Sequence, residues 1–461
     1  MSETELIGLG GLAVLFLLLG LRMPVGLAML AVGVAGNYVL SLAAPYLRFE
    51  PYLRQFKTLL WGTVANYDLS VVPLFVLMGY LASHANMSRD LFQGVNAFFG
   101  RLRGGVAMAA VGACAGFGAV CGSSLATAST MGRVALPELR RLNYSPRLAT
   151  GSLAAGGTLG ILIPPSVVLV IYAIIVEASI IEMFQAAVIP GAIAVLFFMG
   201  VIALITRLRP AYAPDPETVS PQQRRRAVIR VIPVLLIFSA IILGLGFGLF
   251  TPTPAAAVGV FAVLAYGLLL RLRGEGLTGE GIRRSFLDAA VTSGMIYFIL
   301  FGAEVLKGFF TRAGLPEALA QWAATSAFEP MTVMFCMLAV LIVLGFFMES
   351  LSMILVVVPF FWPALVVLNG GDFVPAADAA FGMDNEQLKI WFGILALIVV
   401  ELGLITPPVG LNVFIISALA ENVPMRETFL GVVPFFGAEL LRISLILLFP
   451  WLTLALPAWL G

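Results

Sequence analysis

The sequence has few of the residues that bind transition metals or form disulfides. Its 461 residues include one histidine, His84, and three cysteines, Cys114, Cys121 and Cys336, with no CxxC pair. A single histidine excludes a His-ligated metal cluster and the HExxH helix of zinc proteases. Cysteines in apolar surroundings are most simply packing residues. We therefore expect no transition-metal site.

Charged residues are also scarce. Only 11% of the residues are charged and 61% are hydrophobic, with a mean hydropathy of +1.04. A soluble domain cannot bury that much apolar surface. Apolar runs of about 17 to 25 residues recur along the chain, without the alternating pattern of an outer-membrane barrel. The sequence predicts an all-α polytopic membrane protein, and its net charge of +1 gives no reason to expect a nucleic-acid partner.

The basic residues predict an orientation in the membrane. If the N-terminus is outside, most of them fall on cytoplasmic loops, and Arg442 lies within a span. The acidic N-terminal head without a small-residue cleavage site indicates a retained first span rather than a signal peptide. The long polar linker 207–230 is then cytoplasmic, and its arginines are expected to anchor it to anionic lipid. Six basic residues fall on the opposite, periplasmic side: Arg48, Arg54, Lys57, Lys307, Arg312 and Lys389.

The two halves of the chain, 1–206 and 231–461, resemble each other. Four pairs of motifs occur in the same order, and the clearest pair is "GILIPPSVVL" (160–169) with "GLITPPVGLN" (403–412). One such pair of apolar segments could match by chance, but four in order argue against chance. An odd number of spans per half inverts the second copy relative to the first, and inverted repeats with interrupted helices are typical of secondary transporters.

The repeated Pro-Pro motifs predict helices that are broken inside the membrane, at about 148–178 and 389–420. Pro407 and Pro408 lack amide donors and end the preceding helix, which leaves its last carbonyls unpaired. Thr406 and Asn412 add neutral side-chain oxygens. Irregular backbone at this depth must be buried in protein or line a wet cavity, and an oxygen-only site suits Na⁺. The alternative is a proline-kinked helix whose kink serves only helix packing and binds no ion.

The small-residue segment "GFGAVCGSSLATASTMG" (116–132) predicts a re-entrant helical hairpin at about 106–135, with its tip at 121–124. Its two apolar arms are short for a hydrocarbon layer of about 30 Å. Ser123, Ser124 and Thr127 offer hydroxyls at the tip, and the start of the second arm is suited to an anionic group. Close helix packing by small residues is the alternative reading, and both can hold together.

A matching hairpin is predicted at about 331–366, with Glu349, Ser350 and Ser352 at its turn. Carboxylates inside a membrane are rare, so Glu349 and Glu401 are functional candidates, although Glu401 could equally accept backbone amides at the break. No Lys or Arg occurs between Arg103 and Arg133 or between Arg312 and Lys389. An anionic substrate would therefore need helix N-termini, hydroxyls and bound cations, which favours cation coupling.

The chain resembles the DctM-like large membrane subunit of tripartite ATP-independent periplasmic (TRAP) transporters. The resemblance extends from about residue 20 to about residue 420, and the motifs that carry it are "MPVGLAM", "VPLFVLMG", "CGSSLATASTMG", "GTLGILIPPS", "GLFTPTPAAAVG" and "ELGLITPPVGLNVF". It implies a sodium-driven, elevator-type importer of small organic acids in the bacterial inner membrane. Its expected partners are a small four-helix DctQ-like membrane subunit and a periplasmic DctP-like substrate-binding protein.

The resemblance also implies sodium sites beside each hairpin. The expected sodium-binding residues are Ser123, Ser124, Gly160, Pro164, Glu349, Ser350, Thr406, Pro407 and Gly410. The residues expected to bind substrate are Ser124, Thr127, Thr158, Ser166, Glu349, Ser352 and Asn412.

Three features depart from the family pattern. Glu349 stands where an aspartate is usual, Pro254 stands where a glutamate is expected, and 369–389 is longer than the norm, on the side where a binding protein would dock. A stand-alone sodium/carboxylate symporter is the main alternative function. An intramembrane enzyme is disfavoured because the lone His84 and the scattered acids offer no catalytic pair. A passive channel fits the duplicated breaks less well than alternating access does.

Overall fold

The computed structural model describes residues 2–44, 46–215, 220–272, 274–326, 328–346 and 348–460, and all regular secondary structure within them is helical. The first half contains ten α-helices: α1 (Glu3–Gly20), α2 (Val25–Ala43), α3 (Phe49–Val64), α4 (Val71–His84), α5 (Met87–Phe99), α6 (Gly105–Cys121), α7 (Ser124–Arg141), α8 (Pro146–Leu162), α9 (Val167–Val176) and α10 (Ile180–Leu208).

The second half contains ten more: α11 (Pro221–Gly246), α12 (Pro252–Arg271), α13 (Gly279–Ala313), α14 (Leu315–Thr325), α15 (Pro330–Gly345), α16 (Ser350–Asn369), α17 (Asn385–Gly403), α18 (Leu411–Leu419), α19 (Met425–Leu448) and α20 (Trp451–Leu460).

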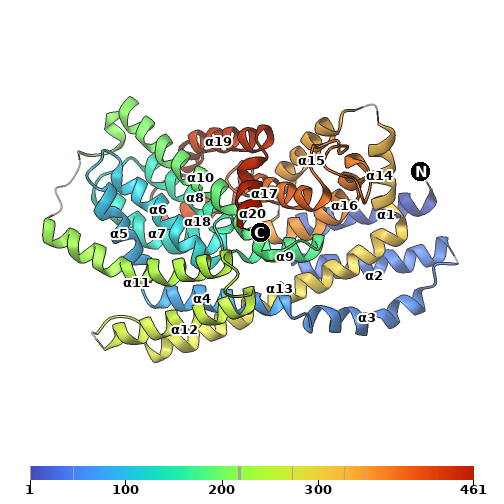
Figure 1. The fold of residues 1–461 in the computed structure, drawn as a ribbon, viewed down its shortest axis with the longest axis horizontal. Coiled ribbons are helices and arrows are strands. Elements are labelled where there is room, and N and C mark those ends of the chain that lie inside the picture. The colour runs from blue at the N-terminus through green and yellow to red at the C-terminus, as the bar shows by residue number, and fades with distance from the viewer. Residues whose placement is uncertain are drawn as a thin grey trace.

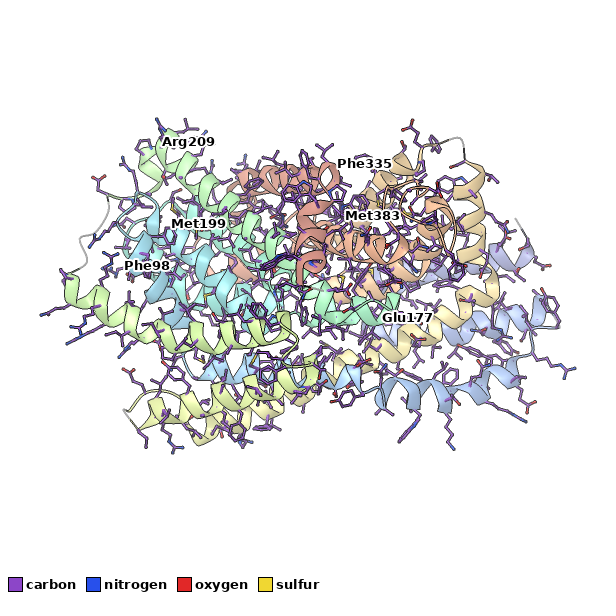
Figure 2. All side chains as sticks on the ribbon, in the orientation of Figure 1. Phe98, Glu177, Met199, Arg209, Phe335 and Met383 are labelled. Atoms are coloured by element: carbon purple, nitrogen blue, oxygen red, sulfur yellow. The ribbon has the colours of Figure 1, made fainter. Side chains whose placement is uncertain are left out.

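Eight helices in the described ranges are long and apolar enough to cross a membrane, or up to ten if each of two bent helix pairs is one span. Many apolar side chains are exposed on the periphery, as expected for a surface that faces lipid. Figure 2 labels two of them, Phe98 and Phe335, which are each about half exposed. The prediction of an all-α polytopic membrane protein is confirmed.

The helices form two groups in Figure 1. The long helix α13 packs against α2, α3 and α4, while α4 also packs against α12. Together with α11, these helices run along the lower side of the view. The second group contains the predicted hairpins and broken helices, and there α8 packs against α6, α7 and α19.

The first hairpin turns where the sequence predicts. Helix α6 ends at Cys121, Gly122 adopts a left-handed conformation with φ 61°, and Ser123 caps α7 by accepting a hydrogen bond from the Ala126 amide. Glycine adopts this conformation without the steric cost of a Cβ. The second arm, α7, continues to Arg141.

The second hairpin has the same plan. Helix α15 ends at Gly345, and α16 starts at Ser350 with Glu349 as its N-terminal flanking residue. In each hairpin the first arm approaches the following broken helix through a pair of glycines. A Cβ on Gly118 would lie 2.5 Å from the Cα of Gly160, and one on Gly403 would lie 2.6 Å from the Cα of Gly345. Only glycine permits backbones to pack this closely.

Both Pro-Pro motifs interrupt helices. Helix α8 stops at Leu162 and α9 starts at Val167, with a bend of 44° between them. Helix α17 stops at Gly403 and α18 starts at Leu411. The Pro164–Pro165 and Pro407–Pro408 peptide bonds are both cis.

The polar tract 207–230 is partly helical. Helix α10 extends to Leu208, and α11 already begins at Pro221, so only the middle of the tract connects them. Proline is favoured in the first turn of a helix, and the arginines that follow are good helix formers. Residues 216–219 lie outside the described residues.

Ionic contacts join several loops that the basic residues assign to one side of the membrane. Arg103 lies 3.3 Å from Asp215, Arg147 pairs with Glu427, and Arg230 lies 3.2 Å from Glu275. Figure 2 labels Arg209 near one end of the molecule, beyond the end of α10.

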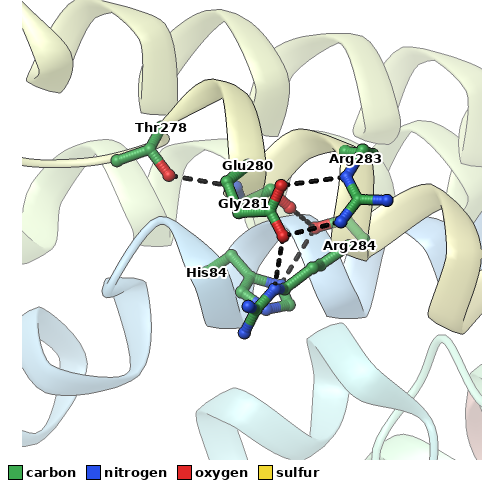
Figure 3. Close-up of polar contacts among 7 residues, drawn as sticks. His84, Thr278, Glu280, Gly281, Arg283 and Arg284 are labelled. Atoms are coloured by element: carbon green, nitrogen blue, oxygen red, sulfur yellow. Dashed lines mark hydrogen bonds and ion pairs between the residues drawn. The ribbon is translucent and has the colours of Figure 1, made fainter.

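The start of α13 forms another such cluster, shown in Figure 3. Glu280 accepts hydrogen bonds from Arg283 and Arg284 at 2.8–2.9 Å. The His84 ring lies beside them, with its Nδ1 3.0 Å from the Ser285 hydroxyl. The cluster joins the end of α4 to the start of α13.

Candidate transport site

A cavity of about 160 Å³ lies between the two hairpin tips and the helices α4 and α13. The tips supply Ser123, Ser124, Glu349 and Ser350 to its lining. Four of the residues predicted at the two tips therefore meet at one cavity, although they lie more than 220 positions apart in the sequence.

The second arm of each hairpin starts at this cavity. Ser124 is the first helical residue of α7, and Ser350 is the first helical residue of α16. Both helix N-termini therefore present free amide groups and a partial positive charge to the cavity. This arrangement can hold an anionic group without a basic side chain.

The opposite wall comes from α4 and α13. It includes Tyr80 and Ser83 of α4 and Thr292 of α13. The Tyr80 hydroxyl lies 2.9 Å from the Thr292 hydroxyl and joins these two helices. The sequence did not point to these residues, although Tyr80 directly follows the motif "VPLFVLMG" (72–79), which could have directed attention to this helix.

The cavity has no basic side chain. Among the described residues that line it there is no lysine, arginine or histidine, and Glu349 supplies its one carboxyl group. The remaining polar lining consists of hydroxyls, and Phe117, Ile161 and Val167 supply apolar surface. The lining hydroxyls belong to Tyr80, Ser83, Ser123, Ser124, Thr130, Thr292 and Ser350.

A second carboxylate, Glu401, lies behind the two tips at the end of α17. The Ser350 hydroxyl donates to its Oε1 at 2.7 Å, and the Ser124 hydroxyl interacts with the same carboxylate. Glu439 and Arg442 of α19 form a buried ion pair close enough to act on Glu401 electrostatically. The sequence marks Glu401 as a functional candidate, but it does not predict Ser350 and Ser124 at the two hairpin tips as its neighbours.

Several buried oxygens around the hairpins have no hydrogen-bond partner among the described residues. They are Thr127 Oγ1, Ser352 Oγ, Glu401 Oε2 and Asn412 Oδ1. Burying an oxygen without a partner is costly, so such atoms mark positions where a ligand or water fits. Hydroxyl, amide and carbonyl oxygens suit a hard cation such as Na⁺ and do not suit soft metals.

Thr127 lies with other oxygens at the surface of α8. A Cβ on Gly160 would lie 2.5 Å from Thr127 Oγ1 and 2.8 Å from the Ser123 carbonyl oxygen, so both oxygens face Gly160. Asn412 of α18 reaches the same helix, because its amide nitrogen donates to the Ala154 carbonyl at 3.4 Å. Residues of both halves thus meet at α8.

The other predicted residues near the first break are buried close to the hairpin tip. Ser166 caps α9 by accepting a hydrogen bond from the Leu169 amide at 3.4 Å. It also lies beside the hairpin tip, because a Cβ on Gly122 would be 3.4 Å from the Cα of Ser166. The Thr158 hydroxyl donates to the Ala155 carbonyl within its own helix at 2.6 Å. Pro164 is buried within the break.

The second break is placed differently. The Thr406 hydroxyl donates to the Leu402 carbonyl at 2.6 Å, and Thr406 and Pro407 line a separate apolar recess with Phe429 of α19. Gly410 adopts φ 59° beside the Thr406 carbonyl. These three predicted sodium residues therefore lie together, but Thr406 and Pro407 line a different recess from Glu349 and Ser350.

Comparisons with known proteins agree with this architecture. Residues 12–452 match the family model described as "Tripartite ATP-independent periplasmic transporter, DctM component". The C4-dicarboxylate TRAP transporter large permease protein DctM of Pseudomonas aeruginosa is 33% identical over 423 residues, which are 92% of this chain and 94% of that protein. The sialic acid TRAP transporter large permease protein SiaM of Vibrio cholerae is 30% identical over 396 residues, 86% and 87% of the two chains.

The structure is also similar to that of the YdaH transporter of Alcanivorax borkumensis. The TM-score is 0.59, with 16% sequence identity, and the match covers 89% of this chain and 90% of the other. At this identity the likeness concerns the fold alone. The family match over nearly the whole chain decides the assignment: the chain is a multi-pass transporter permease, not an enzyme, and it belongs to the DctM family of TRAP transporter large permeases.

Proposed function

We propose that this permease imports small organic acids across the bacterial inner membrane by sodium-coupled, binding-protein-dependent transport. The observation that carries the proposal is the cavity at which both hairpin tips meet. It offers two helix N-termini and a set of hydroxyls to an anion, and buried unpartnered oxygens lie around it.

Sodium coupling is supported by the lack of basic groups at the site. An organic anion that enters the cavity meets no basic side chain among the described lining residues, and the carboxyl groups of Glu349 and Glu401 lie at and behind the tips. Bound cations would offset the charge of the anion, and their release would weaken anion binding. Thr127, Ser123 and Gly160 are the strongest candidates for one sodium site, and Thr406, Pro407 and Gly410 remain candidates for another.

An elevator mechanism is supported because the two walls of the cavity belong to different groups of helices. The hairpins and broken helices form one wall, while α4 and α13 form the other and are joined by the Tyr80–Thr292 contact. We propose that the two repeats, 1–206 and 231–461, are inverted and that the hairpin group moves against α4 and α13 with the substrate. The N-terminus is then periplasmic.

The proposed partners are a small DctQ-like membrane subunit and a periplasmic DctP-like substrate-binding protein. The decisive experiment is uptake of radiolabelled organic acids into proteoliposomes under an imposed sodium gradient, with each of the two partners present or omitted. We expect uptake only with sodium and all three proteins. Sodium-dependent uptake by this chain alone would instead support the stand-alone symporter, and uptake that ignores sodium would refute the coupling.

A further inference from the structure

We propose that two adjoining grooves along α19 bind one anionic phospholipid, whose phosphate contacts Arg209 and Arg426 and whose two acyl chains each occupy one groove. The two grooves share no lining residue with the transport cavity. The inference therefore goes beyond the proposed function and does not depend on its substrate or its coupling ion.

The first groove, of about 450 Å³, lies between α10 and α19, which pack against each other and against α8. Its walls are mainly apolar. Leu204 and Leu208 of α10 and Val433 of α19 line it, and each of these side chains is more than half exposed. A continuous exposed apolar surface of this kind marks a site of contact with lipid or another partner.

The second groove, of about 490 Å³, lies beside the first. It is the recess lined by the break before α18 and by Phe429 and Phe436 of α19. Leu430 and Val433 line both grooves, so these two side chains form the ridge that separates them. A molecule with two apolar chains joined at one end can straddle this ridge, as a phospholipid does.

Basic side chains line both grooves. Arg147 and Arg209 line the first groove and Arg426 lines the second, and the described lining residues of the two grooves include no acid. Arg147 already pairs with Glu427. No acid among the described residues forms an ion pair with Arg209 or Arg426, so both guanidinium groups can bind an anion such as a phosphate.

Tyr212 holds Arg209 beside the first groove. Arg209 Nη1 donates to the Tyr212 hydroxyl at 2.8 Å, and the guanidinium carbon lies 5.5 Å from the centre of the Tyr212 ring. A guanidinium group has five N–H donors, so the others remain available to phosphate oxygens. Figure 2 shows Arg209 beyond the end of α10. Its position is partly fixed before the lipid binds, which lowers the entropy cost of binding.

The three arginines lie at helix ends that meet on one side of the protein. Arg147 is in the first turn of α8, Arg426 is in the first turn of α19, and Arg209 follows the last residue of α10. The sequence predicts that all three are cytoplasmic. Basic pockets between membrane helices on this side bind anionic headgroups, and the N-termini of α8 and α19 add partial positive charge.

The test measures lipid binding to the purified full-length permease in detergent by native mass spectrometry. Phosphatidylglycerol and phosphatidylcholine with identical acyl chains are titrated separately, because they differ in net charge but not in their apolar part. We expect phosphatidylglycerol to bind about tenfold or more tightly, as two arginines at a membrane surface imply. Equal binding of the two lipids would overturn the inference.

The test variant combines Arg209→Gln with Arg426→Gln. The matched control combines Arg207→Gln with Arg133→Gln, which removes the same charge from two exposed arginines that line neither groove. We expect the test variant to bind phosphatidylglycerol no better than phosphatidylcholine, and the control to keep the preference of the wild type. An equal loss in both would show a general attraction between charges and would overturn the specific site.

Thermal unfolding distinguishes a lipid from a soluble phosphate ester. Phosphatidylglycerol should raise the melting temperature of the wild type and of the control, but not that of the test variant. Glycerol 3-phosphate at the same concentration should have no effect, because it has no chains to fill the grooves. Equal stabilisation by glycerol 3-phosphate would assign the arginines to a soluble anion and overturn the lipid site.

Discussion

The Ser350 hydroxyl donates to Glu401 Oε1 at 2.7 Å, which ties the tip of the second hairpin to the end of α17. The Ser124 hydroxyl of the first hairpin interacts with the same carboxylate. Ser350 and Ser124 are the first helical residues of the two second arms. Glu401 therefore lies behind the cavity where the two tips come together, and its hydrogen bond at 2.7 Å is to the second tip.

Ser350→Ala should destabilise the permease. It removes a buried hydrogen bond and leaves Glu401 Oε1 without this donor, which costs about 1–3 kcal/mol. Thermal unfolding of the purified protein in detergent measures the effect. Ser444→Ala is the control, because that hydroxyl is exposed and bonds only within its own helix. Equal melting temperatures for the two variants would show that the Ser350–Glu401 contact contributes nothing.

Thr127→Val should weaken sodium binding without destabilising the protein. Valine preserves the volume of threonine but removes a buried oxygen that lacks a protein partner, so the sodium-free protein should be as stable or more stable. The sodium concentration for half-maximal uptake should rise severalfold.

Thr150→Val is the matched control for Thr127→Val. Thr150 is also buried and lies on α8, but its hydroxyl donates to the Pro146 carbonyl at 2.7 Å. This variant should lose some stability and keep its sodium response. A Thr127→Val protein with an unchanged sodium response would exclude Thr127 as a sodium ligand.

Gly160→Ala should abolish most transport. The added methyl would lie 2.5 Å from Thr127 Oγ1 and 2.8 Å from the Ser123 carbonyl, so these oxygens must move. Overpacking of this kind costs about 1–3 kcal/mol. Uptake assays and thermal unfolding should both show the loss. Gly200→Ala, where the methyl meets open space, should behave as the wild type.

Arg442→Met should destabilise the protein more than the other variants. Arg442 and Glu439 are both buried within α19, and loss of one member of a buried ion pair costs about 3–5 kcal/mol. Adding Glu439→Gln should restore part of the melting temperature, because no unpaired charge then remains. If the double variant melts at or below the temperature of Arg442→Met, the pair is not coupled.

The positions of the hairpins and breaks could be predicted from the sequence because they depend on local chemistry. Gly122 adopts a left-handed conformation at a turn, and each of the two Pro-Pro pairs interrupts a helix. The turn at 121–124 and the breaks after Leu162 and Gly403 follow from these residues alone. Repetition of the Pro-Pro motif also indicated that each half contains a broken helix.

The wall formed by α4 and α13 could not be predicted in the same way. Tyr80 and Thr292 are ordinary residues within apolar helices, and their contact joins positions 212 residues apart. The partners of Glu401 and the separate recess of Thr406 likewise depend on how the two halves pack. Local patterns carry no information about that packing, so a charged residue could be noticed but its partner could not.

Residues on the two walls of the cavity should differ in whether they contact the substrate from one side of the membrane or from both. In an elevator cycle, a substrate travels with the hairpins and leaves α4 and α13 behind. A side chain on a hairpin, such as Glu349, then meets the substrate whichever compartment it faces, whereas Tyr80 meets it in only one position of the carrier. If the permease cycles as we propose, a change at Glu349 would alter the apparent affinity for substrate on both faces of the membrane, whereas Tyr80→Phe would alter it only on the face at which the cavity meets α4.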